Sequence, residues 1–399
     1  MSEYQYYEFL ALDRRLTEKE MKELRAISSR AEITPTSFVN EYNYGNFRGD
    51  PYRLMASYFD AHVYVTNWGT HQLMLRVPRA LVTPEELEPY RGEDVFTFQE
   101  AGESLILTFD SSDEGSGDWE EGSGWMAALA PVRAELLAGD RRALYLAWLL
   151  FAQRLDFDDE DFEDEYDEEG LEDDEFGLGA VEPPVPPGLG ALSGPLASLA
   201  DFLRIDEDLI AVAAERSPAG VEDDEELAAW IASLAEEEKN GLLLEAARGR
   251  GTNFGPSLLA RFRASREGRS EEAAGGRTVR ELLEAGERRR EEREREEARR
   301  KAEERARKQA AAAKARAKYL DDLVTRQGAV WKKVEGLVEE KKAKPYDEAV
   351  SLLVDLRDVA QRTKAIAGFE ARFAKLLEGF SKRPALLERL RKARLLGDR

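Results

Sequence analysis

The first 155 residues alternate short apolar runs with signals for helix starts. Runs rich in aromatic and β-branched residues predict six strands, over 4–13, 36–44, 61–68, 71–77, 94–99 and 104–109. Capping boxes at Thr17 and Thr83, and an Asp-Pro pair at Asp50, predict three helix starts among these strands. Two further helices are predicted over 125–138 and 140–153. The order βαβαββαββαα predicts an α+β domain over 1–155 with a mainly antiparallel sheet, of which a ferredoxin-like sandwich is one version.

Beyond residue 194 apolar positions recur every three or four residues, which is the helical period. We expect a small module of three or four helices over 195–275. A capping box at Thr278 then opens a long charged helix, predicted over 276–343. Its part from Glu284 to Lys318 has no large apolar residue, so a coiled coil would have no seam to bury. Pairs of Glu with Arg or Lys support an isolated helix, a spacer roughly 50 Å long.

After Tyr319 the helical apolar period returns, and Pro345 interrupts it. Three more amphipathic helices are predicted over 346–360, 366–380 and 384–396. We expect an all-α bundle over 344–399 that packs on the end of the long helix.

The amino-acid composition limits the catalytic and metal-binding chemistry that the chain can carry. The 399 residues include no Cys and only two His. The chain therefore cannot form disulfides, and it has no Cys to bind zinc or an iron–sulfur cluster or to act as a thiol nucleophile. Two His leave little material for a Ser-His-Asp site or a multi-His metal centre. We expect no cofactor, no metal and no catalytic residues, which favours a function other than catalysis.

The charge of −23 is unevenly distributed. Residues 277–399 hold 34 Lys and Arg against 23 Asp and Glu, a net of +11, which leaves −34 for residues 1–276. The extreme is Asp156–Phe176, with 15 acids in 21 residues and no base. Together with the Pro- and Gly-rich text that follows, it predicts a disordered linker over 156–194. Aromatic residues interleaved with the acids leave two interpretations open, a binding segment that mimics nucleic-acid charge and a solvated linker.

The N-terminus MSEYQYYEFL lacks the basic start of a signal peptide. The most apolar stretch, Ala143–Phe151, is about half the length that a membrane span needs. We therefore expect a cytoplasmic protein that does not enter membranes.

Two segments suggest metal binding, each beside a plainer interpretation. His62 and His71 lie on two strands predicted to pair around Gly69, and Asp60 is a nearby carboxylate. The plainer interpretation is that both are ordinary strand residues. Asp110–Glu121 partly matches the spacing of an EF-hand calcium loop, although a flexible acidic loop also explains it.

Four segments together resemble an uncharacterised family of bacterial proteins. They are TPTSFVNEY (34–42), VTNWGTHQLMLRVP (65–78), VPPGLG (185–190) and DFLRIDEDLIAVAAE (201–215). The resemblance covers most of the chain outside the acidic segment. Since the family has no established activity, the resemblance implies a bacterial, cytoplasmic origin and no site residues.

Three functions follow from these patterns. The leading hypothesis is a non-catalytic, multi-domain interaction or scaffold protein with protein partners. The alternative is an accessory subunit of a nucleic-acid-handling complex that binds phosphate through its basic C-terminal half, with the acidic linker as an intramolecular competitor. Its candidate contacts are Arg299, Arg300, Lys301, Arg305, Arg307, Lys308, Lys314, Arg316 and Lys318. A solvated helix end explains the same run without a ligand. A third hypothesis is an enzyme that uses Asp, Glu, Tyr and Arg of the first domain.

Overall fold

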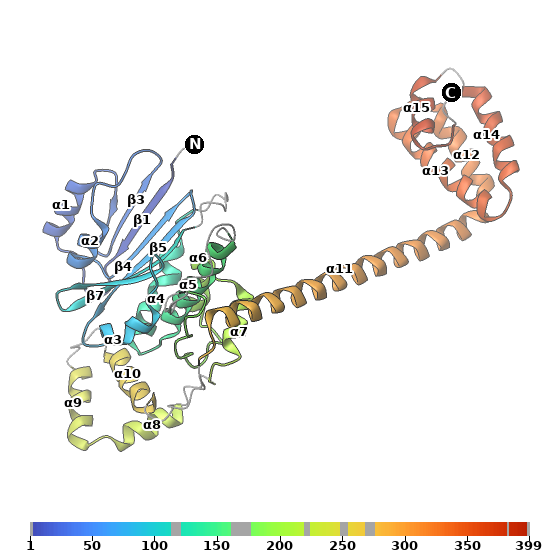
Figure 1. Cartoon of the computed structure of the whole chain (residues 1–399). Coiled ribbons are helices and arrows are strands. Elements are labelled where there is room, and N and C mark those ends of the chain that lie inside the picture. The colour runs from blue at the N-terminus through green and yellow to red at the C-terminus, as the bar shows by residue number, and fades with distance from the viewer. Residues whose placement is uncertain are drawn as a thin grey trace, which may run out of the picture. The chain divides into compact units, whose positions relative to one another are not determined.

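The computed structural model describes residues 3–112, 121–160, 177–218, 224–247, 254–267, 276–380 and 383–396. By its internal contacts the chain divides into two compact units (Figure 1). Unit 1 covers residues 1–292, and unit 2 covers residues 293–399. Each unit is described by itself.

Unit 1 is built on one antiparallel sheet. Its described strands are β1 (Gln5–Leu10), β2 (Glu32–Ile33), β3 (Ser37–Tyr42), β4 (Ala61–Thr66), β5 (Thr70–Pro78), β6 (Phe96–Ala101) and β7 (Ser104–Ser112). They follow the order β2-β3-β1-β4-β5-β7-β6. The predicted α+β class and all six predicted strands are confirmed. The two-residue strand β2 was not predicted, and the seven-strand order differs from the four-stranded βαββαβ arrangement of ferredoxin-like proteins.

Helices cover both faces of the sheet (Figure 1). On one face lie α1 (Glu18–Ile27) and α2 (Pro51–Ser57), which bury Leu24, Leu54 and Met55. The Thr17 capping box and the Asp50 cap start these two helices as predicted. The short helix α3 (Pro84–Leu87) continues into a 3-10 turn, η1 (Glu88–Tyr90). The other face is covered by α4 (Trp125–Leu137), α5 (Arg142–Glu160) and α6 (Gly194–Leu203), and α7 (Glu207–Ala214) packs on α5 in the same core.

The helices after residue 194 differ from the predicted separate module. Helix α6 buries Leu199, Phe202 and Leu203 in the same core as the sheet. The side chains of His71 and Ser111 donate to the carbonyls of Phe202 and Leu203, which lie at the end of α6. These hydrogen bonds satisfy backbone groups that a helix end leaves free, so α6 belongs to unit 1. Helices α8 (Asp224–Ser233), α9 (Glu236–Ala247) and α10 (Phe254–Glu267) follow.

The predicted linker over 156–194 divides into three parts. Helix α5 extends to Glu160, residues 161–176 lie outside the described residues, and residues 177–193 are packed. In the packed part Leu189 is buried, and its amide donates to the Ser217 hydroxyl. The Arg142 guanidinium donates to the carbonyls of Gly188 and Ala191. This proline-rich segment is ordered because residues distant in the sequence form hydrogen bonds with its backbone groups.

The long helix is confirmed as one element, α11 (Val279–Val324). Thr278 and Glu281 form the predicted capping box at its start. The helix ends earlier than the predicted 343, and Arg326 leaves helical geometry at φ −116° and ψ 10°. Helices α12 (Gln327–Glu339), α13 (Ala343–Arg362), α14 (Ile366–Phe380) and α15 (Pro384–Lys392) then form a bundle around Trp331, Leu353 and Leu390. None of the described helices is long and apolar enough to cross a membrane.

Candidate functional site

The two histidines do not form a site together. His62 pairs with Met74 in the sheet, whereas His71 pairs with Val65. Because side chains alternate between the faces of a strand, the two rings lie on opposite faces. Among the described residues no three His, Asp or Glu side chains are placed to hold a metal ion. The hypothesis of a two-histidine metal site with Asp60 is therefore wrong. The calcium-loop hypothesis falls mostly on residues 113–120, which lie outside the described residues.

Each histidine is part of the core. The His71 ring stacks on Phe202, accepts at Nε2 from Arg204 and donates from Nδ1 to the Phe202 carbonyl. His62 is fully buried, stacks on Phe9 at 3.9 Å and donates from Nδ1 to the Glu8 carbonyl. Its Nε2 has no partner among the described residues. Burial lowers the pKa of His62 to about 4, and the hydrogen bond to Glu8 offsets only part of that effect.

Replacing His62 with Phe should flatten the pH dependence of stability in mild acid. Between pH 6.5 and 4 the unfolded chain binds a proton at His62 and the folded chain does not, so acidification lowers the free energy of unfolding. We expect wild type to lose about 2–3 kcal/mol more than His62→Phe between pH 7 and pH 4.5. Urea denaturation of both proteins at the two pH values measures the difference. Equal losses would contradict the assigned burial.

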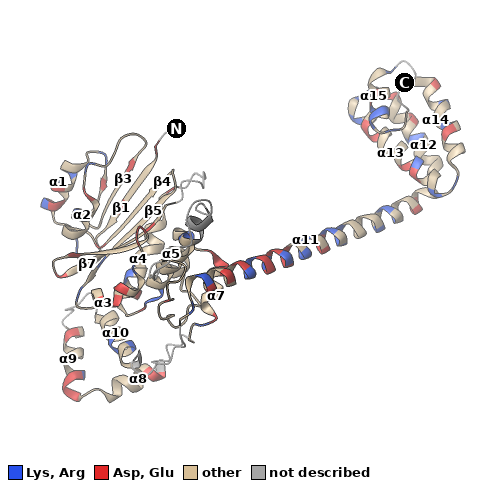
Figure 2. Cartoon of the chain, in the orientation of Figure 1, with Lys and Arg blue, Asp and Glu red and all other residues tan. Residues whose placement is uncertain are grey.

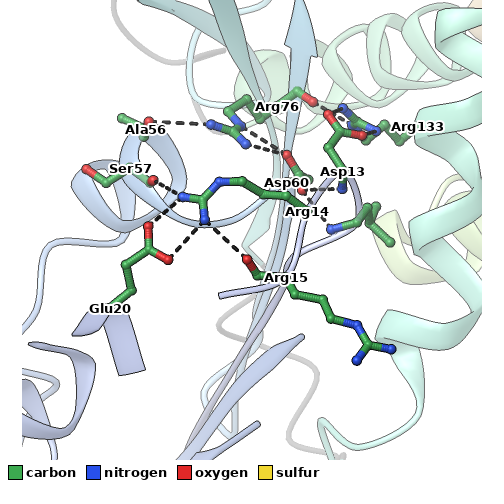
Figure 3. A network of polar contacts seen from close by, with 10 residues as sticks. Asp13, Arg14, Arg15, Glu20, Ala56, Ser57, Asp60, Arg76 and Arg133 are labelled. Atoms are coloured by element: carbon green, nitrogen blue, oxygen red, sulfur yellow. Dashed lines mark hydrogen bonds and ion pairs between the residues drawn. The ribbon is translucent and has the colours of Figure 1, made fainter. Parts of the chain in front are cut away.

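A buried ionic network joins four segments of unit 1 (Figure 3). Asp60 is fully buried at the start of β4, where one carboxylate oxygen accepts from the amides of Leu12 and Asp13. Its other oxygen accepts from Nε of Arg76 on β5 at 3.1 Å and from Nη2 of the same residue at 2.5 Å. Burial alone raises the pKa of Asp60, but the Asp13 amide and the Arg76 guanidinium outweigh it and leave the pKa below its usual value.

Arg133 of α4 extends this network. It binds both carboxylate oxygens of Asp13, at 2.9 and 2.7 Å, and donates to the Arg76 carbonyl. Asp13 and Asp60 are two carboxylates that each contact an arginine, which are residue types that the enzyme hypothesis uses. Every carboxylate oxygen, however, already accepts a hydrogen bond from the protein. The network links the sheet to α4 through charged hydrogen bonds.

A second buried cluster fixes the start of α11 in unit 1. Glu182 accepts from the Tyr145 hydroxyl and forms an ion pair with Arg277, with Nε and Oε2 2.8 Å apart. Both charged side chains are less than a tenth exposed. Burial, followed by the charge of Glu182, raises the pKa of Tyr145, so this hydroxyl stays protonated and donates. Neither buried cluster was singled out from the sequence, because their partners lie 16 to 120 residues apart.

Replacing Glu182 with Gln should destabilise unit 1 by about 3 kcal/mol, because it leaves the buried Arg277 charge without a counter-ion. The amide of Gln can still accept from Tyr145, which keeps the loss toward the low end for a broken buried pair. Chemical denaturation measures the loss, and hydrogen exchange at the amides of Val279 and Arg280 locates it. Glu215→Gln is the matched control, since Glu215 is an exposed partner of Arg289. A similar small loss in both variants would contradict this assignment.

The basic run of α11 carries a surface of a different kind. Residues 305–320 contain six Arg and Lys and no acid, and Figure 2 shows bases without acids over this stretch. At 3.6 residues per turn, four bases fall within about 40° of one another on the helix. We call them the basic line: Arg300, Arg307, Lys314 and Lys318. The line runs for about 27 Å at 1.5 Å per residue, and all four residues are exposed.

The structure separates the nine candidate contacts. Arg299, Lys301 and Lys308 pair with glutamates of α11. Arg316 is bound by Asp355 and Asp358 of α13, at 2.5 and 2.8 Å. Arg305 is exposed but lies roughly 140° from Arg300 around the helix. Within the part of the chain that the structure describes, no residue of the basic line forms an ion pair, although the charge of Arg300 contributes, after those of Lys301 and Arg293, to the lowered pKa of Glu297.

The basic line has a fixed orientation within unit 2. Arg316 lies roughly 160° around the helix from Arg300, on the side that contacts α13. On the same side Leu320 and Leu323 pack against Val359 of α13. The basic line therefore lies on the opposite side of α11 from α13. Its spacing of seven, seven and four residues was readable in the sequence, but which bases are already paired was not.

Comparison of the chain with protein-family models, with curated proteins and with solved structures found no match. The resemblance of segments such as 34–42 and 65–78 to an uncharacterised bacterial family therefore stays a prediction.

Proposed function

We propose that this protein is a non-catalytic interaction protein whose C-terminal unit binds the phosphate backbone of nucleic acid. One observation carries the proposal: the basic line is exposed, faces away from α13 and has no ion pair among the described residues. Phosphate contacts by Arg and Lys supply most of the non-specific affinity of proteins for nucleic acid. Charges already paired with glutamate would contribute less, because their partners repel phosphate.

Binding of this kind should be independent of base sequence. The described part of α11 from Val279 to Lys318 contains no aromatic residue. Its sole amide side chain is Gln309, roughly 180° around the helix from Arg300. Amides and arginines that reach base edges read sequence, whereas phosphate contacts only position the protein, and the proposal assigns Arg300 and Arg307 to phosphate. The proposed role is therefore that of an accessory subunit, which adds affinity rather than specificity.

Salt titration of the intact chain tests this proposal. Four phosphate contacts predict that affinity for mixed-sequence duplex DNA falls about a hundredfold between 50 and 200 mM salt. Fluorescence anisotropy with labelled double- and single-stranded DNA measures it. Absence of binding to either at low salt would refute the function.

The acidic segment enters the proposal as an intramolecular competitor. Its stretch 161–176 lies outside the described residues, and its 11 Asp and Glu without a base are the charges that would compete with phosphate. We expect its deletion to raise the affinity for DNA several-fold at low salt, and to change it little at high salt where charges are screened. Replacement by a Gly- and Ser-rich segment of equal length is the control for tether length. Unchanged affinity at low salt would remove the competitor from the proposal.

Protein partners belong to the same class of function. The accessory role requires at least one protein that supplies catalysis or sequence specificity. Co-purification of the intact chain after nuclease treatment tests for such a partner. An intact chain that retains none would leave nucleic acid as its sole binding partner and contradict the scaffold part of the proposal.

A further inference from the structure

The basic line is a rigid array of charges. Its four residues lie on one uninterrupted helix, with spacings of about 10.5, 10.5 and 6 Å along the axis. The helix between Arg299 and Ala315 is exposed at every residue, so no other part of unit 2 restricts access to it. The helix fixes the spacing of the four charges before binding, so binding has to order only their side-chain rotamers.

Single-stranded nucleic acid gains little from such a surface. Proteins that prefer single strands offer aromatic side chains on which bases stack. Tyr319 is the nearest aromatic residue, and its hydroxyl donates to Asp355 on the α13 side of the helix. A flexible strand would have to be ordered along the line without any stacking in return.

We infer that the basic line binds double-stranded nucleic acid in preference to single strands, an inference that rests on the proposed function. A duplex presents its phosphates in a stiff array with one charge per about 1.7 Å of axis. The basic line, about 27 Å long, matches roughly eight base pairs at 3.4 Å each.

An anionic lipid surface is the main alternative acceptor for a line of bases. Stable binding of a helix to lipid requires an apolar face beside the basic one. Between Glu284 and Lys318 the helix has alanine as its largest aliphatic residue. The surface therefore offers charge without an apolar anchor, and the duplex fits it better.

The test compares three probes on the intact chain. They are a mixed-sequence duplex of about 20 base pairs, a single strand of the same length, and vesicles containing anionic lipid. Each phosphate contact releases about 0.9 counterions on duplex DNA and about 0.7 on a single strand. Four contacts then predict about five- to tenfold tighter binding to the duplex at 0.1 M salt.

The outcomes separate this inference from the proposed function. Equal or tighter binding to the single strand would overturn the duplex preference and leave phosphate binding in place. Preference for vesicles over both nucleic acids would overturn both. Absence of all binding at low salt would refute the function and the inference with it. A five- to tenfold preference for the duplex over the single strand that is lost when the basic line is changed to Gln, but kept when four other bases of α11 are changed, supports the inference.

Discussion

Replacing Asp60 with Asn should lower the free energy of unfolding of unit 1 by about 5 kcal/mol, at the upper end for a broken buried ion pair. The carboxylate accepts from two amides and from two nitrogens of Arg76, and all four donors would lose a charged acceptor. An Asn side chain also has a donor that cannot pair with the amides of Leu12 and Asp13. Urea denaturation followed by circular dichroism measures the loss.

The same variant has a second signature in acid. Because the pKa of Asp60 is lower in the folded protein than in the unfolded chain, its contribution is complete above the unfolded pKa of about 3.9. It is lost as the pH falls through the folded pKa, a loss that the Asn variant cannot show. Glu100→Gln is the control, since Glu100 pairs with Arg79 at the surface and should contribute about 0–1 kcal/mol. Equal losses in the two variants would contradict the structural role of the network.

Neutralising the basic line should reduce affinity for duplex DNA on the order of 10³-fold at 0.1 M salt. The variant carries Arg300→Gln, Arg307→Gln, Lys314→Gln and Lys318→Gln, and Gln keeps a high helix propensity. The matched control changes four other bases of the same helix: Arg299→Gln, Lys301→Gln, Arg305→Gln and Lys308→Gln. Both variants lose four charges from the same helix, but three of the control bases are paired with glutamates whereas the basic line forms no ion pair among the described residues. Equal loss of affinity in both would mean that net charge, rather than the basic line, drives binding.

The sequence predicted local structure well. Several of these predictions depend only on residues that are neighbours in the sequence. They are the strand containing Tyr7 and Phe9, the capping boxes at Thr17 and Thr278, and the absence of large apolar residues along most of α11. Such signals can be read without knowing what the segment packs against. The two-residue strand β2 escaped prediction because it has no period of its own and exists by pairing with β3.

Long-range pairing was beyond prediction. The prolines and glycines of residues 177–193 predict a linker, but in the structure Arg142 and Ser217 donate hydrogen bonds to backbone carbonyls of this segment. The pair Glu182 and Arg277 is 95 residues apart, and no spacing rule connects them. The predicted hairpin brings His62 and His71 onto two paired strands, but the strand register puts their side chains on opposite faces of the sheet. The candidate contacts were identified by charge, and only the structure separated Arg316 from the four residues of the basic line.

The salt dependence of DNA binding tests the central claim most directly. In a plot of the logarithm of affinity against the logarithm of salt concentration, each phosphate contact contributes about 0.9 to the slope. The basic-line variant should therefore have a slope shallower than wild type by about 3.6, and the matched control should differ from wild type by less than about 1. Slopes that fall equally in the two variants, or in neither, would contradict phosphate binding by this side of α11.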